Sequence, residues 1–360
     1  MNKELNIAVI GCGYWGGNYV RLFTELPDTR VAIACDQKPE NLVKIGERFP
    51  STTLTTDMSV VMQMGGIDAV VIATNATTHF DIARQCLEAG KPVLLEKPMT
   101  TTVADAERLI EIAELHKVPL MIGHIYLYNP GVRKIKSLIE NKELGQLYYL
   151  YTQRTNMGPI RTDVNAMWDL APHDVSIMNY LMNASPEWVS AVGHNAIPTS
   201  SEDVGFIVLG YPNNVVGHIH VSWADPKKVR QLVAVGSEMR AVFNDLDPQE
   251  PVRMFEKGVS APEPTSYGEH RFYIRNGDII SPTVPIREPL SEQGKHFIEC
   301  IVNGTRPISD GYNGLEVVRV MEAVDRSIAL KGAPIHLQTM EIGHGENGSS
   351  SEEEIERNIR

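Results

Sequence analysis

Several common features are scarce or missing in this sequence of 360 residues. The four cysteines lie far apart, without the Cys-x-x-Cys spacing of a zinc module and without a disulfide framework. No run reaches the roughly 18 apolar residues that a membrane helix needs, and the first residues lack the apolar core of a signal peptide. We therefore expect a cytoplasmic chain with no membrane partner.

Positive charge is also scarce, because 33 Lys and Arg face 45 Asp and Glu, for a net charge of −12. A nucleic-acid partner needs a basic stripe, and this balance argues against one. Part of the excess is local, since residues 341–360 hold six Glu and two Arg among Gly, Asn and Ser. Segment 336–360 is therefore predicted to be an acidic, flexible tail.

Hydrophobic residues make up 42% and charged residues 22%, which is typical of soluble globular chains, and the length predicts two domains. Up to about residue 124, short apolar runs alternate with helix-length amphipathic stretches, as in parallel strands joined by crossover helices. The predicted strands are 6–10, 31–35, 69–73, 92–95 and 119–123, and the predicted helices are 15–26, 39–49, 79–89 and 102–116. We predict an α/β domain with a parallel sheet over residues 1–124.

After residue 124 the pattern changes to longer alternating segments that follow one another through short turns. The predicted strands are 146–155, 188–192, 204–209, 215–222, 229–235 and 239–243, the predicted helices are 132–141, 169–182, 291–302 and 314–331, and 259–269 is predicted to be a loop. Residues 125–335 are therefore predicted to form an α+β domain with an open, largely antiparallel sheet. Because an open sheet must cover its exposed face, we expect a homodimer or homotetramer formed through this sheet, with Trp223 on that surface.

A glycine-rich loop follows the first predicted strand. Gly11, Gly13 and Gly16 match G-x-G-x-x-G, and Tyr14 and Trp15 stand at the start of the helix that follows. In this arrangement the backbone approaches a pyrophosphate, whose charge then lies at the positive end of the helix. The loop predicts a Rossmann domain that binds a dinucleotide.

Asp36 supports this prediction, because it ends the next strand, 20 residues after Gly16. A carboxylate at this position accepts hydrogen bonds from the adenosine ribose hydroxyls and repels a 2′-phosphate, which favours NAD over NADP. Lys38 could pair with a 2′-phosphate if the loop turned it inward; otherwise it is a solvated surface lysine.

Three short motifs occur further along the chain. Glu96-Lys97-Pro98 follows a predicted strand, Gly123-His124 ends the first domain, and Asp169-x-x-x-His173 lies at a predicted helix start. Together with the glycine loop they resemble the Gfo/Idh/MocA oxidoreductase family over residues 5–335. Segment 161–174 is similar to the branch of that family that acts on sugar nucleotides, whose members oxidise or reduce the sugar at carbon 3.

The resemblance implies that Lys97 lies beside the nicotinamide, that the Lys97–Pro98 bond is cis, and that Asp169 and His173 line the substrate hydroxyl. General chemistry supports compatible roles, since oxidation of a carbinol needs a base for the hydroxyl proton and an imidazole suits that task. We predict His173 as the general acid/base and Lys97 as the group that polarises the oxygen or relays the proton. Asp169 would orient His173 or bind a neighbouring hydroxyl.

The assignment of the carboxylate has two alternatives. An Asp before a helix is most often an N-cap, so Asp169 could cap the helix without taking part in the chemistry. The family often has an acidic residue four positions after the histidine, where this chain has Ile177. Asp174 could therefore be the partner of His173 instead.

The resemblance also places residues at the cofactor and at the substrate. Thr74, Asn75, His79 and Glu96 would lie near the nicotinamide ribose, which agrees with ligand binding at the carboxyl ends of parallel strands. The candidate substrate residues are Tyr126, Asn129, Arg154, Arg161, Asn165 and Trp168. Arg154 and Arg161 would suit a diphosphate through bidentate contacts. The family commonly has an Arg at the position where this chain has Leu127.

No metal site is predicted, because His218 and His220 share one face of a strand but no third ligand has suitable spacing. The sequence predicts an NAD-dependent oxidoreductase acting on a sugar hydroxyl, most specifically carbon 3 of a UDP-N-acetylhexosamine. By the resemblance, an aminotransferase could consume the resulting ketone. The alternatives are an inositol or free-sugar dehydrogenase and a non-catalytic NAD-binding sensor.

Overall fold

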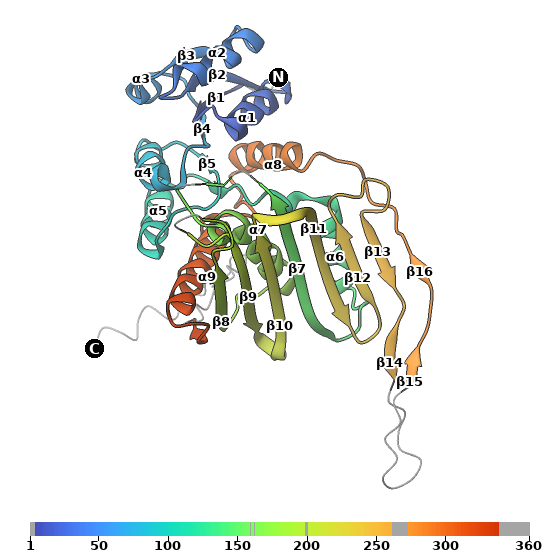
Figure 1. The fold of residues 1–360 in the computed structure, drawn as a ribbon. Helices are drawn as coiled ribbons and strands as arrows, with labels where there is room; N and C mark the ends of the chain where they lie inside the picture. The colour runs from blue at the N-terminus through green and yellow to red at the C-terminus, as the bar shows by residue number, and fades with distance from the viewer. Residues whose placement is uncertain (1–3, 159, 162, 199–200, 261–272, 338–360) are drawn as a thin grey trace, which may run out of the picture.

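Two β-sheets organise the protein, one of six and one of nine strands (Figure 1). The structure is a computed structural model that describes residues 4–158, 160–161, 163–198, 201–260 and 273–337. Two predicted segments fall mostly outside the described residues. Of the predicted tail at 336–360 the structure describes 336–337, and of the predicted loop at 259–269 it describes 259–260.

The first sheet is parallel throughout, with strand order β3-β2-β1-β4-β5-β6. Its strands are β1 Leu5–Ile10, β2 Thr29–Cys35, β3 Thr53–Thr55, β4 Ala69–Ile72, β5 Val93–Leu95 and β6 Leu120–Ile122. Every residue of β4, β5 and β6 is buried, as expected of parallel strands covered on both faces. This is the doubly wound order of a dinucleotide-binding domain, which confirms the predicted Rossmann sheet.

Five helices belong to this sheet: α1 Tyr14–Glu25, α2 Pro39–Arg48, α3 Met58–Gln63, α4 His79–Glu88 and α5 Val103–His116. Four of them lie within a few residues of their predicted positions. The sequence analysis missed α3 and β3, because an element of six or three residues is too short to show a period.

The second sheet is mixed, with strand order β16-β13-β12-β11-β7-β10-β9-β8-β17. Its strands are β7 Leu147–Met157, β8 Trp188–His194, β9 Val204–Tyr211, β10 Val215–Ser222, β11 Ala224–Gly236, β12 Arg240–Asn244, β13 Val252–Phe255, β16 Ile279–Ile280 and β17 Ile335–His336. Among its described strands only β7 and β10 pair in parallel, so the prediction of an open, largely antiparallel sheet is confirmed. A separate hairpin, β14 Gly258–Ser260 and β15 Tyr273–Arg275, extends beyond the sheet (Figure 1).

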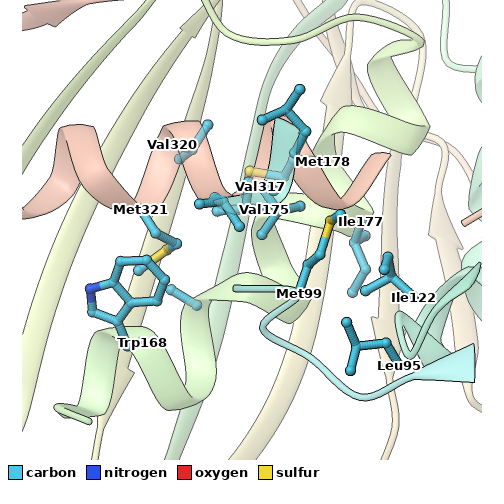
Figure 2. Packing of buried hydrophobic residues seen from close by; sticks show 14 of the residues in the cluster. Leu95, Met99, Ile122, Trp168, Val175, Ile177, Met178, Val317, Val320 and Met321 are labelled. Carbon is cyan, nitrogen blue, oxygen red and sulfur yellow. The ribbon is translucent and has the colours of Figure 1, made fainter. Parts of the chain in front are cut away.

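Three helices pack on one face of the second sheet: α6 Pro130–Glu140, α7 Ala166–Met182 and α9 Gly311–Ala329. Figure 2 shows side chains of α7 and α9, among them Val175, Met178 and Val317, packed together with Met99 and Ile122 of the first domain. One continuous core therefore joins the two sheets, and α7 lies at its centre.

Helix α7 begins three residues earlier than predicted, because Asn165 is its N-cap and accepts a hydrogen bond from the Trp168 amide at 2.9 Å. Asp169 therefore lies within the first turns of the helix. The alternative in which Asp169 caps the helix is wrong, since the cap is Asn165.

Helix α8 (Pro289–Asn303) returns from the second half of the chain to cover α1, where the rings of Phe297 and Phe23 lie 6.4 Å apart (Figure 1). Ser309 then donates a hydrogen bond to the Ile122 carbonyl at the end of β6. The domain boundaries proposed from the sequence, at residues 124 and 335, stay predictions.

The face of the second sheet opposite these helices carries exposed apolar side chains, including Val192 and Phe206 on β8 and β9 and Tyr149 and Val216 on β7 and β10. Trp223 was expected on this surface, but it is 2% exposed and lies in the site described below. Within the described residues, no helix is long and apolar enough to cross a membrane.

Candidate active site

The glycine loop joins β1 to α1 as predicted. Gly11 has a φ of +86°, and a Cβ on Gly16 would lie 1.7 Å from the Gly11 carbonyl oxygen, so the backbone packs against itself here. Gly13 is the N-cap of α1 and has open space around it. Within the described residues no side chain caps this helix end, so its amides are available to an anion.

A groove of about 380 Å³ runs along the carboxyl edge of the first sheet beside this loop. Five residues that were predicted to bind the cofactor line it: Gly11, Gly13, Asp36, Thr74 and Asn75. Lys38 lines the groove as well and keeps an exposed side chain, so both interpretations of it stay open. Tyr14 and Trp15 project outward at the start of α1, 82% and 39% exposed.

Asp36 holds the loop to the end of β2. Its carboxylate accepts hydrogen bonds from the Cys12 amide at 2.7 Å, the Lys38 amide at 2.8 Å and the Asn41 side chain at 3.0 Å. An acidic group at the groove, uncapped helix amides and a tight glycine turn together fit a dinucleotide with a free ribose 2′-hydroxyl.

Lys97 follows β5 and reaches across to α7. Its Nζ donates to the backbone carbonyl of Asp169 at 2.7 Å and lies 3.4 Å from the Asp169 Oδ1, and its side chain is 8% exposed. The Lys97–Pro98 bond is cis, as the resemblance implied. The ammonium group therefore lies where the carboxyl edge of the first sheet meets the second domain.

The Asp169 carboxylate lies among three donors. Besides Lys97, Arg161 donates to Oδ1 at 3.1 Å and the Trp223 indole donates to Oδ2 at 3.2 Å. Burial raises the pKa of Asp169, but the charges of Lys97 and Arg161 outweigh it, so the pKa lies below its usual value. Asp169 is therefore ionised and holds Lys97 in place.

His173 lies one turn further along α7. Its ring packs edge-on against Tyr126, with the ring centres 5.2 Å apart, and its buried Nδ1 has no hydrogen-bond partner among the described residues. Burial, together with the charges of Lys97 and Arg154, keeps the pKa of His173 well below 6.5. The imidazole is therefore neutral and able to accept a proton. No hydrogen bond found in the described part of the chain joins it to Asp169.

Arg154 and Asp174 form a buried bidentate ion pair behind His173. The Arg154 Nε and Nη2 each donate to an Asp174 oxygen at 2.9 Å, and Nη1 donates to the Tyr126 hydroxyl at 2.9 Å. The alternative in which Asp174 is the partner of His173 is wrong, because the carboxylate points to the arginine. The predicted diphosphate contact of Arg154 is also disfavoured, because all three guanidinium nitrogens already donate within the protein.

Tyr126 and Asn129 share a partner that the sequence analysis did not name. Tyr126, in the short helix η2 (Ile125–Tyr128), donates from its hydroxyl to Asp245 at 3.1 Å, and the Asn129 side-chain amide donates to the same carboxylate at 3.2 Å. Asn129 also caps α6, accepting from the Gly131 amide. These contacts fix the tyrosine ring beside His173.

The other predicted substrate residues divide into two groups. Arg161 stays at the site, paired with Asp163 and Asp169, and its side chain is 29% exposed. Asn165 caps α7 and also donates to Glu202 at 3.1 Å. Trp168 lies in the core beside Met321 (Figure 2), where its indole donates to Asp325 at 2.8 Å.

His79 and Glu96 lie beneath the site and not at its surface. His79 is 1% exposed, and its ring nitrogens lie 2.7 Å from the Pro98 carbonyl and 3.2 Å from the Thr74 carbonyl. Burial lowers its pKa to about 4, so the neutral ring can donate to only one of the two. Glu96 is buried, accepts from the Tyr19 hydroxyl at 2.8 Å and from the Lys97 amide, and has a pKa raised by burial.

Sequence reasoning missed four residues of the site: Asp163, Trp223, Arg230 and Asp245. Arg230, on β11, donates to the Asn156 side chain at 2.8 Å and to two backbone carbonyls, and it forms no ion pair within the described residues. Burial and the nearby charge of Arg154 lower its pKa. Asp163 stands two residues from Arg161, in the segment 161–174 described above. No local motif marks the other three, because Trp223 between β10 and β11, Arg230 on β11 and Asp245 after β12 reach the site through the pairing of the sheet strands.

His218 and His220 lie on the outer face of the second sheet, stacked on Phe206 at ring-centre distances of 6.4 and 4.5 Å. In the part of the chain that the structure describes, no group of three or more His, Cys, Asp or Glu side chains is placed to hold a metal ion.

The chain is similar to two curated dehydrogenases over almost its whole length. D-apiose dehydrogenase from Paraburkholderia graminis is 21% identical, with 94% of this chain and 91% of that protein covered. The NAD(+)-dependent scyllo-inositol 2-dehydrogenase from Bacillus subtilis is 25% identical, with 94% and 97% covered.

Comparison with solved structures gives the same fold. The UDP-N-acetylglucosamine 3-dehydrogenase GnnA from Acidithiobacillus ferrooxidans superposes with a TM-score of 0.75 at 22% identity, covering 92% of this chain and 99% of that one. Residues 5–124 match the model of the oxidoreductase family with an NAD-binding Rossmann fold, and residues 132–242 match the C-terminal domain model of the same family. The chain therefore belongs to the Gfo/Idh/MocA oxidoreductase family, with an NAD-binding Rossmann domain followed by that family's C-terminal domain.

Proposed function

We propose that this protein oxidises a ring hydroxyl of a sugar with NAD, and that Lys97, Asp169 and His173 carry the reaction. One observation carries the proposal: the Lys97 ammonium contacts the ionised Asp169, and the neutral imidazole of His173 lies one helical turn further along α7. These groups lie at the carboxyl edge of the parallel sheet, where a Rossmann domain presents its cofactor.

The reaction removes a hydride from the carbinol carbon and a proton from its hydroxyl, giving a ketone, NADH and one proton. When bound, NAD supplies the hydride acceptor. His173 takes the hydroxyl proton, because burial keeps its ring neutral. Lys97 donates a hydrogen bond to the oxygen as negative charge develops on it. Asp169 fixes the position of Lys97 and balances its charge.

The substrate we favour is a UDP-N-acetylhexosamine that reacts at carbon 3. One observation supports an anionic substrate: Arg230 has no carboxylate partner in the described residues. The structural neighbour GnnA is named for this reaction. A 3-keto product would suit an aminotransferase as the next enzyme.

A free sugar or cyclitol is the second candidate. The ion pair with Asp174 occupies Arg154. All three guanidinium nitrogens of Arg161 likewise donate to Asp163 or Asp169, so both arginines expected to hold a diphosphate are occupied. The curated relatives named for D-apiose and scyllo-inositol have uncharged substrates.

A substrate panel tests the proposal. Purified protein is given NAD with UDP-N-acetylglucosamine, UDP-N-acetylgalactosamine, myo-inositol, scyllo-inositol or D-apiose, and NADH absorbance is followed. Turnover of a UDP-sugar alone supports the favoured substrate, and turnover of the uncharged compounds alone contradicts it. No turnover with any of them, together with tight NAD binding, would favour a non-catalytic sensor.

Arg230→Gln separates the two substrate classes. We expect it to raise KM at least tenfold for a UDP-sugar, because a charge-assisted contact to phosphate is lost. Arg240→Gln is the matched control, because Arg240 lies on β12, where it donates to Tyr151 and packs over Phe255. An unchanged KM in Arg230→Gln would remove Arg230 from the diphosphate site.

We also propose that the protein is a homodimer or homotetramer formed through the outer face of its second sheet. Exposed Tyr149, Val192, Phe206 and Val216 form an apolar surface there, and such a surface marks a contact site. Phe206→Asp should reduce the mass measured by light scattering to that of one chain. A wild-type protein that elutes as a monomer would contradict this assignment.

A further inference from the structure

His124 is buried beside Lys97, and none of the roles described above uses it. Strands β5 and β6 are parallel neighbours in which Leu95 is paired with Ile122. Two residues further on, this register places Lys97 beside His124. The register holds past the strand ends, because a Cβ on Gly123 would lie 3.2 Å from the Cα of Glu96.

The His124 ring has no hydrogen-bond partner in the part of the chain that the structure describes. Its side chain is 0% exposed, and both Nδ1 and Nε2 are buried without a partner among the described residues. A buried polar atom without a hydrogen bond costs about 1–3 kcal/mol. A fully buried aliphatic side chain would avoid that cost, so the fold alone gives no reason for a histidine here.

Lys97 supplies a donor that matches this acceptor. Its ammonium has three N–H groups, and the described contacts to the carbonyl and the carboxylate of Asp169 use two of them. Burial and the charge of Lys97 lower the pKa of His124 to about 3, so the ring is neutral and has one acceptor nitrogen. A donor and an acceptor thus stand at matching positions just after two adjacent strands.

We propose that His124 is a positioning residue for Lys97: in the catalytic complex its acceptor nitrogen takes one N–H of the ammonium and the Asp169 carbonyl keeps a second. The third N–H then turns from its 3.4 Å contact with the Asp169 Oδ1 to the reacting oxygen. The proposal rests on the role given to Lys97 in the proposed function. Asp169 then holds the ammonium from the second domain, while His124 holds it from the first. These two contacts fix the direction of the third N–H group.

The first test compares His124→Leu with His124→Gln. Leu fills the space without polar atoms, so the melting temperature should stay the same or rise. The value of kcat should fall roughly 10- to 100-fold, because the lysine is misaligned, while the Kd for NAD stays within about threefold. Gln keeps an acceptor and should retain most of kcat. A kcat in His124→Leu within twofold of wild type, or equal losses in both variants, would overturn the proposal.

The second test does not depend on turnover, so it also decides the matter if no sugar is oxidised. The protein is labelled with ¹⁵N-histidine and bound to NADH, and nitrogen NMR reports whether the acceptor nitrogen of His124 is hydrogen-bonded. The signal that disappears in His124→Gln identifies this nitrogen. We expect a hydrogen-bonded signal in wild type and a free one in Lys97→Met. Arg161→Gln removes a nearby charge and is the control, in which the signal should stay bonded. The same signal in wild type and Lys97→Met would contradict the contact.

Discussion

Lys97 donates a hydrogen bond of 2.7 Å to the backbone carbonyl of Asp169, a residue 72 positions away in the sequence. The bond joins the end of β5 in the first sheet to the first turns of α7 in the second domain. The cofactor groove and the proposed base are therefore held together through the lysine that we place at the reacting oxygen.

The glycine loop gives a prediction with a matched control. Gly16→Ala places a Cβ 1.7 Å from the Gly11 carbonyl oxygen, so both the melting temperature and NAD binding should fall. Gly13→Ala has open space around its Cβ, so it should fold like wild type and lose NAD affinity only, because the methyl group stands at the phosphate side of the helix end. Calorimetric titration and thermal melting measure the two effects. Equal melting temperatures in both variants would contradict this account.

The buried ion pair should dominate local stability. Asp174→Asn leaves the Arg154 charge without its partner, and we expect a loss of about 3–5 kcal/mol in the free energy of unfolding. Glu111→Gln breaks an exposed pair with Arg108 and should cost no more than about 0.5 kcal/mol. Urea unfolding gives both values. A small loss in Asp174→Asn would mean that water reaches the arginine in solution.

Buried histidines make stability depend on pH. Burial lowers the pKa of His79 to about 4 and that of His124 to about 3, whereas an unfolded histidine titrates near 6.5. Below pH 6.5 the unfolded chain binds protons that the folded chain does not, so stability is complete above that pH and falls below it. Each histidine should contribute about 1.4 kcal/mol per pH unit.

Urea unfolding at pH 7, 6 and 5 measures this slope. His124→Gln removes one of these histidines while His79 and His173 keep their lowered pKa values, so it should lower the slope by the share of one histidine. If the variant had the slope of wild type, His124 would be able to take up a proton in the folded protein.

Asp36 should set the choice between NAD and NADP. Asp36→Ser removes the carboxylate that would repel a 2′-phosphate, so the Kd for NADP should fall relative to that for NAD. The Cys12 amide contact is lost as well, so the affinity for NAD should also decrease. Fluorescence titration with both reduced cofactors measures the ratio. A ratio unchanged from wild type would place the selectivity elsewhere, with Lys38 as the next candidate.

Local motifs allowed the cofactor end of the site to be predicted from sequence. Gly11, Gly16 and Asp36 lie within one strand–helix–strand unit, and their roles depend on that unit alone. The partners of Asp169 were not predictable, because Trp223 reaches it only through the pairing of β7 with β10 and β11. A motif gives the residue type and spacing, whereas sheet register decides which distant side chains meet.

Helix phase explains the wrong assignments near His173. The sequence placed the start of α7 at residue 169, so Asp169 could be its cap, whereas the observed cap is Asn165. Asp174 was an alternative partner because the family's acid is replaced by Ile177. Adjacent residues of a helix point about 100° apart, and Asp174 faces Arg154 instead of His173. The helix start thus decides the first assignment, and the helix phase decides the second.

The most direct test of the account is the effect of Lys97→Met on turnover and on cofactor binding. The substrate is whichever sugar the wild-type protein oxidises, and NADH formation is followed beside the Kd for NAD. We predict a loss of at least about 1,000-fold in kcat, because the group that stabilises the oxyanion is gone, with the Kd for NAD within about threefold of wild type. A variant that keeps more than about a tenth of the wild-type kcat would contradict the central role given to Lys97.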